Sequence, residues 1–292
     1  MAFARAASAL LMATSVSATG ILLPLYTYPS AEHGDGAANW RPALDAMAAS
    51  AAVPWLAVVN PGDGPGQTGG APGNGDANYL AGVSQLNAQP NVQTLGYVRT
   101  GYGAAPQAEL QANVTTWASW ASYAGDGDGG ENVGVDGIFF DEASAADFEY
   151  LNVAVAHARA AFGSKQIVAV CNFGSAAPAE FYAICDVVVV FESFLNNNNN
   201  PDAAAAPAYM GKATVEANTP AGGGYAAQAA VLVHDFVGAA ADGREADAAL
   251  LRSYVQEAGD ADVGLGWLYF CSGGYDSITT APATVGALAA AF

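Results

Sequence analysis

Hydrophobic residues in this chain of 292 residues fall in short runs separated by longer alanine-rich stretches. Runs of about four to eight apolar residues are typical of strands in a parallel sheet that is covered on both faces. The stretches between them carry helical patterns or glycine and proline turn signals. The predicted strands are residues 21–28, 55–60, 92–98, 133–142, 166–171, 187–192, 229–234 and 264–270.

Helical patterns alternate with these runs. The predicted helices are residues 40–50, 79–87, 107–123, 145–162, 178–184, 245–258 and 283–292. An asparagine run at 196–200 and the poorly patterned segment up to 222 are predicted to be irregular. Eight strands alternating with helices indicate an α/β fold, a single (β/α)8 barrel, with a doubly wound open sheet as the alternative. Because no linker or composition shift marks a boundary, residues 19–292 are expected to form one domain.

The charge balance narrows the classes of partner. The chain has 8 basic and 27 acidic residues, a net charge of −19. This argues against nucleic acids and anionic membranes, which select basic patches. It favours adaptation to solubility or salt, or a cationic partner. No run of eighteen apolar residues occurs, so we expect no membrane span. We also expect the protein to be a monomer.

Residues 1–18 resemble a secretory signal, with Arg5, a modest apolar segment and a small-residue end. A secreted or cell-wall protein is therefore expected, with an unstructured leader as the alternative. Cys171, Cys185 and Cys271 allow at most one disulfide within the chain, and buried free thiols are equally compatible. Neither the cysteines nor the histidines have metal-ligand spacing, so we expect no metal and no organic cofactor.

The run at 133–142, VGVDGIFFDE, stops on two adjacent carboxylates, Asp141 and Glu142. An acid at this point either serves a functional site or caps the next helix. Adjacent strand residues face opposite sides, so both can face one site only if the strand ends at Asp141 and Glu142 turns inward. Alternatively, one of the two orients its neighbours. Crowded acids should raise the pKa of one of them and supply a proton donor.

Glu192 repeats this design at the end of the apolar run 187–191. In a barrel, the carboxyl ends of strands four and six meet at the same rim, where catalytic residues lie. Glycosidic cleavage uses two carboxyl groups, one to protonate the leaving oxygen and one to attack, stabilise or activate water at the anomeric carbon. The sequence therefore predicts a glycoside hydrolase centre.

Further polar and aromatic residues are predicted at strand ends, where the aromatics would stack on sugar rings. For any single aromatic, ordinary packing is the more frequent role. The candidate substrate-binding residues are Tyr28, Asn60, Tyr97, Arg99, Tyr102, Asn172, His234, Trp267 and Tyr269. His234 is also suited to orienting a carboxylate.

Five segments together resemble a known family: 23–29 (LPLYTYP), 60–66 (NPGDGPG), 96–102 (GYVRTGY), 136–142 (DGIFFDE) and 191–193 (FES). The chain from 21 to 292 is similar to the spherulin-4-like, or spherulation-specific family 4, proteins, which include fungal glycoside hydrolases of family 135. The resemblance implies a (β/α)8 barrel and endo-acting hydrolysis of α-1,4-linked N-acetylgalactosamine in galactosaminogalactan, a partly deacetylated and therefore cationic polymer. It places the functional acids on Asp141, Glu142 and Glu192.

Within this trio we predict Glu142 as the general acid, with Asp141 or Glu192 opposite it. Retention, inversion and assistance by the substrate's N-acetyl group all stay open. An acidic rim would attract protonated galactosamine units, which predicts rates that fall as salt rises. The competing hypothesis is a non-catalytic carbohydrate-binding or wall-associated structural protein on the same barrel.

Overall fold

A computed structural model of the chain describes residues 19–30, 35–67, 70–123, 132–196, 207–222, 224–273 and 284–292. The predicted leader, residues 1–18, and most of the asparagine run lie outside these ranges.

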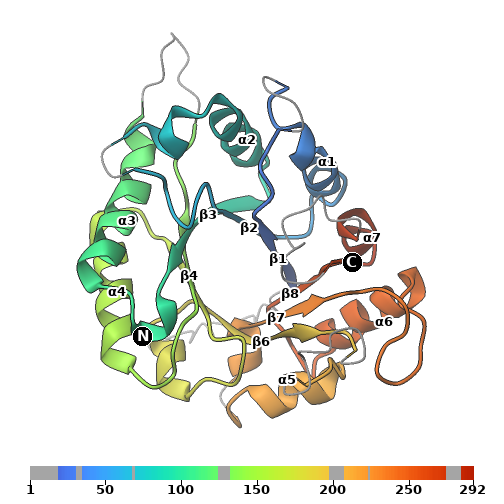
Figure 1. Cartoon of the computed structure of the whole chain (residues 1–292). Coiled ribbons are helices and arrows are strands. Elements are labelled where there is room, and N and C mark those ends of the chain that lie inside the picture. The colour runs from blue at the N-terminus through green and yellow to red at the C-terminus, as the bar shows by residue number, and fades with distance from the viewer. Residues whose placement is uncertain are drawn as a thin grey trace, which may run out of the picture.

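Eight parallel strands close into a barrel in chain order, which confirms the predicted fold (Figure 1). Each strand pairs with its sequence neighbours, and β8 closes the ring by pairing with β1. The strands are β1 (Gly20–Leu25), β2 (Trp55–Val59), β3 (Val92–Arg99), β4 (Gly137–Asp141), β5 (Val168–Asn172), β6 (Val187–Phe194), β7 (Ala229–His234) and β8 (Trp267–Phe270).

Helices surround the barrel and cover its outer face, as the view along the barrel in Figure 1 shows. Their apolar faces pack on the outward-pointing strand residues, which gives the layered core typical of this fold. The α-helices are α1 (Arg41–Ala49), α2 (Ala77–Asn87), α3 (Gln107–Ser119), α4 (Phe148–Ala161), α5 (Lys212–Asn218), α6 (Ala248–Gly259) and α7 (Val285–Ala289). Among the described residues, no helix is long and apolar enough to cross a membrane.

Two elements sharpen the prediction. The short helix predicted at residues 178–184 is a 3₁₀ helix (Ala179–Ala183). The helix α5 lies in the segment predicted to be irregular. It has only seven residues, begins after Gly211 and ends before Pro220, so it is too short to show a helical period in the sequence.

Other differences concern where elements begin. The strand β4 starts at Gly137, not at 133, and the carboxylate of Asp136, directly before it, accepts a bond from the backbone N–H of Thr94. The helix α4 starts at Phe148 because the side chain of Asp147 caps it through the Tyr150 N–H at 3.0 Å. Capping by Asp141 or Glu142, the alternative to a functional role, is thereby excluded.

A disulfide joins Cys171 of β5 to Cys185, which lies just before β6. Both residues are buried, and the bond fastens β5 to the segment that leads into β6. The third cysteine, Cys271, is a buried free thiol. The pairing resolves the two alternatives left by the sequence: one disulfide forms and one thiol stays free.

Candidate active site

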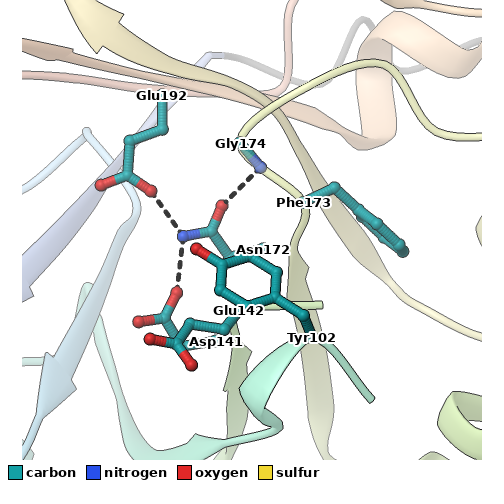
Figure 2. Close-up of a pocket in the computed structure, with 7 residues that line it drawn as sticks. All are labelled: Tyr102, Asp141, Glu142, Asn172, Phe173, Gly174 and Glu192. Atoms are coloured by element: carbon teal, nitrogen blue, oxygen red, sulfur yellow. Dashed lines mark hydrogen bonds between the residues drawn. The ribbon is translucent and has the colours of Figure 1, made fainter. Parts of the chain in front are cut away.

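A cavity of about 390 Å³ opens at the carboxyl ends of the strands β4, β5 and β6. The three predicted acids line it together (Figure 2). Its lining residues are Tyr102, Asp141, Glu142, Asn172, Phe173, Gly174 and Glu192. The structure thus places the trio where a (β/α)8 barrel carries its chemistry.

Asn172 connects two of the acids. Its Nδ2 donates to Asp141 Oδ1 at 2.7 Å and to Glu192 Oε2 at 2.6 Å (Figure 2). The side-chain oxygen of Asn172 accepts from the Gly174 N–H at 3.0 Å, which fixes the orientation of the amide. Both hydrogens of Nδ2 are therefore directed at carboxylates, and a single amide group bridges the two acids.

Asp141 is the acid whose titration is most perturbed. Burial, followed by the negative charge of Glu192, raises its pKa from 3.8 to about 6. Hydrogen bonds from Tyr97 and Asn172 oppose this rise without cancelling it. One pKa of the trio is therefore raised, as predicted from the sequence, but burial of Asp141 is the larger cause and the neighbouring Glu192 the smaller one.

Tyr97 is a buried residue that supports Asp141. Its hydroxyl donates to Asp141 Oδ2 at 2.9 Å, and burial, with Asp141 nearby, raises the pKa of Tyr97. The indole of Trp117 on α3 donates to the Tyr97 carbonyl at 2.8 Å and occupies the space that a side chain at Gly96 would fill. A Cβ at Gly96 would lie 2.3 Å from Trp117 Cδ2, so glycine is required before the tyrosine.

Glu142 reaches the same cavity by a change of backbone direction. The strand β4 ends at Asp141, and Glu142 takes a φ of 54°, in the left-handed region that non-glycine residues seldom adopt. The buried Thr100 stabilises this turn, because its hydroxyl donates to the carbonyls of Asp141 and Glu142. This is the first of the two geometries that the sequence allowed.

Arg99 pairs with Glu142, with Nε 2.7 Å from Oε2. The side chain of Arg99 is 57% exposed and that of Glu142 is 24% exposed. Glu142 is therefore the acid of the trio that has an arginine partner, whereas Asp141 and Glu192 share an amide.

Glu192 is held by a fully buried histidine. His234 Nε2 lies 3.0 Å from Glu192 Oε1, and the tautomer with its proton on Nε2 donates to this oxygen. The predicted role of His234 as an orienter of a carboxylate fits this contact. Contact with a substrate does not, because His234 has no exposed surface.

Tyr28 and Asn60 lie outside the cavity lining and have structural partners. The Tyr28 hydroxyl donates to Asp76 Oδ2 and accepts from Asn78, both at 2.8 Å. Asn60 Oδ1 accepts from the Gly64 N–H at 2.9 Å and so shapes the loop after β2. The structure does not bring either residue to the three acids.

The placement of Trp267 and Tyr269 at the rim was wrong. Trp267 is the first residue of β8, at the opposite end of the barrel, where its ring lies against Gly20 of β1. Tyr269 is fully buried and pairs in register with Leu232, below His234. The predicted strand began at residue 264, whereas β8 begins at Trp267, so Trp267 lies at the start of the strand.

Three residues of the site were not predicted. Phe173 and Gly174 line the cavity, and Thr100 holds the turn at Glu142. The sequence contained a partial signal for the first two, since they follow Asn172 directly at a strand end. No group of three or more His, Cys, Asp or Glu side chains suited to a metal ion occurs in the part of the chain that the structure describes.

Comparison with known proteins agrees with this architecture. Residues 20–290 match the profile of the family described as spherulation-specific family 4. Spherulin-4 of Physarum polycephalum is 32% identical over 191 residues, which are 64% of this chain and 49% of that protein. The chain thus spans about half the length of this curated relative.

Among solved structures, the chain is similar to Aspergillus clavatus Sph3 in complex with GalNAc. The TM-score is 0.72 at 21% identity, over 94% of this chain and 97% of the other, so the two share the fold. With nearly the whole barrel matched by the family profile, the chain belongs to spherulation-specific family 4.

Proposed function

We propose that this protein is an endo-acting glycoside hydrolase of α-1,4-linked N-acetylgalactosamine polysaccharide, with Asp141 and Glu192 as its reacting carboxyl groups. One observation carries the proposal: Asn172 Nδ2 holds a carboxyl group of raised pKa and a second carboxylate side by side in an open cavity. An acid and a carboxylate in one site are what glycosidic cleavage requires.

In this proposal Asp141 donates the proton to the leaving oxygen. With a pKa of about 6, it is protonated in an appreciable fraction of molecules near neutral pH. Glu142, chosen as the donor from sequence, is engaged by the side chain of Arg99, so we assign it to substrate positioning.

Glu192 then acts at the anomeric carbon. Its two oxygens accept from Asn172 and from His234, so the carboxylate is held in one orientation. The Asp141 and Glu192 oxygens that share Asn172 Nδ2 can be no further apart than the sum of the two hydrogen-bond lengths. This favours the ~5 Å spacing of retaining enzymes over the ~6.5–9.5 Å of inverting enzymes.

The substrate class is supported by family membership and by the fold shared with Sph3, whose crystal structure contains GalNAc. The acidic balance of the chain suits a polymer with some free amines. We also propose that the protein acts outside the cell, and the disulfide Cys171–Cys185 is compatible with an oxidising compartment.

The test is incubation of the purified protein with galactosaminogalactan and with N-acetylgalactosamine oligosaccharides. We expect new reducing ends, and proton NMR of the first product should show the α-anomer if the enzyme retains configuration. A β-anomer as first product would overturn the spacing argument. Polymer binding without any new reducing ends would overturn the hydrolase and favour the binding protein.

A further inference from the structure

A second hollow lies beside the cavity on the same rim, between the loop after β2 and the start of α3. Its volume is about 430 Å³. We call it the Arg99 groove, and it is lined by Asp63, Arg99, Gly101, Ala104, Ala105, Pro106, Glu109, Leu110 and Asn113. None of the three acids of the trio lines it.

The Arg99 groove adjoins the cavity through two contacts. Arg99 lines the groove while its Nε bonds Glu142, which lines the cavity. The loop after β3 has Gly101 in the groove and Tyr102 in the cavity, and Tyr102 is 70% exposed. The two hollows thus adjoin each other along the rim at Arg99 and Tyr102.

The charges of the Arg99 groove are unbalanced. Asp63 and Glu109 are exposed, and no side-chain hydrogen bond or ion pair engages either carboxylate within the described residues. Arg99, the cation of the lining, is already bonded to Glu142. With Glu142 included, three carboxylates stand against one guanidinium in charge, so the groove attracts cations and offers hydrogen-bond acceptors.

The backbone at Asp63 fits a functional position. Asp63 has a φ of 53°, a left-handed conformation that costs energy for a non-glycine residue. Tyr102 and Glu142 share this conformation, with φ of 55° and 54°, in the loops that follow β3 and β4. Three successive loops of the rim therefore hold a strained residue beside the two hollows.

We propose that the Arg99 groove binds the sugar unit adjacent to the one in the cavity, and that it selects a 2-amino sugar with a free ammonium group. The ammonium would lie against Asp63 and Glu109, the sugar hydroxyls would meet Arg99 and Asn113, and Tyr102 would stack between the two units. This inference rests on the proposed function and specifies its substrate.

The test compares two sets of galactosamine oligosaccharides of equal length, one fully N-acetylated and one partly deacetylated. In the double variant Asp63→Asn/Glu109→Gln we expect KM for the deacetylated set to rise about three- to tenfold at low salt, with kcat unchanged. This is the effect of losing two exposed ion pairs between the carboxylates and the ammonium group. KM for the acetylated set should stay within about twofold. Asp45→Asn, an exposed position on α1, is the matched control for the lost charge.

Blocking the Arg99 groove gives an independent test. Ala104→Trp, at an exposed position of the lining, should weaken the binding of long oligosaccharides. The binding of oligosaccharides too short to extend beyond the cavity should not change. Calorimetric binding to each set separates this inference from hydrolysis. If the parent protein cleaves the substrate and neither groove variant changes binding or KM, the proposed role of the Arg99 groove is overturned while the hydrolase proposal stands. Weaker binding in the groove variants without any cleavage by the parent would overturn only the hydrolase.

Discussion

The strands β4 and β6 each carry an acid at both ends, and the two ends differ in chemistry. At the start of the strands, Asp136 and Asp186 accept bonds from backbone N–H groups, of Thr94 at 3.1 Å and of Ala169 at 2.7 Å. Each also pairs with a cation: Lys165 lies 2.9 Å from Asp136, and Arg159 lies 3.1 Å from Asp186. These carboxylates hold the barrel ladder where its regular bonding begins.

At the far end of the same strands, Asp141 and Glu192 accept from the side chains of Tyr97, Asn172 and His234. Because Asn172 bonds both acids, their charges lie close together, and after burial the charge of Glu192 is the second cause of the raised pKa of Asp141. On these two strands, an acid before the strand stabilises the fold, whereas an acid near its carboxyl end is available for chemistry.

The largest expected effect is on β6. Glu192→Gln should lower kcat about 10³-fold, because the amide cannot attack or stabilise the anomeric carbon. Asp186→Asn at the other end of the strand should change kcat less than about threefold. The measurement is reducing-end release under saturating substrate, and equal losses in both variants would remove the distinction between the two ends.

A smaller loss is expected when the bridge between the rim acids is removed. Asn172→Ala leaves Asp141 and Glu192 without their shared donor, and misplacement of about 1 Å costs about 10²-fold in rate. We expect kcat to fall about 10- to 100-fold with a smaller change in KM. An unchanged pH profile and kcat in Asn172→Ala would show that the amide does not position the acids.

The pH dependence of cleavage follows from Asp141. A general acid must be protonated, and burial and Glu192 raise its pKa to about 6. The rate should therefore fall about tenfold per pH unit above that pKa. A pH–rate profile that stays level from pH 6 to 8 would exclude Asp141 as the donor.

Stability should change in opposite directions at the two ends. Protonated Asp141 favours the folded state below its unfolded pKa near 3.8, and this contribution is lost as pH rises through about 6. Asp141→Asn should thus raise the free energy of unfolding by about 1–2 kcal/mol at pH 7.5 and by little at pH 4.

Asp186→Ala should instead lower the free energy of unfolding, by about 1–2 kcal/mol, because it leaves the buried N–H of Ala169 without its acceptor. Denaturant unfolding of both variants at the two pH values provides the measurement. A stability loss in Asp141→Asn at pH 7.5 would contradict the account.

The smallest effect concerns salt. If the net charge of −19 draws a partly deacetylated polymer to the rim, kcat/KM should fall severalfold as salt rises. A fully acetylated polymer serves as the control and should show little change. Equal salt dependence for both polymers would leave solubility as the explanation of the acidic balance.

The barrel could be predicted because each strand is an apolar run between turn signals, and the two acidic strand ends stand out on β4 and β6. The site was harder. Nothing in the sequence reports that Glu142 turns into the left-handed region, since this depends on Thr100 reaching across from the loop after β3. The amide of Asn172 as a bridge likewise depends on strand register, which single-sequence patterns do not give.

The aromatic residues show the same limit. Tyr97 and Trp267 both lie on apolar runs, yet one supports a rim acid and the other fills the base of the barrel beside Gly20. Their roles depend on where each strand starts, and a shift of a few residues moves a side chain from one end of the barrel to the other. An apolar run predicts the existence of a strand more reliably than it predicts the residue at which the strand begins.

The most direct test of the account compares Asp141→Asn with Asp136→Asn, the same substitution at the two ends of β4. Both purified variants are assayed for new reducing ends from N-acetylgalactosamine oligosaccharides at pH 6. We predict a loss of about 10³-fold for Asp141→Asn and less than about threefold for Asp136→Asn. Activity retained in Asp141→Asn, or lost equally in both variants, would contradict the claim that the carboxyl end of this strand carries the chemistry.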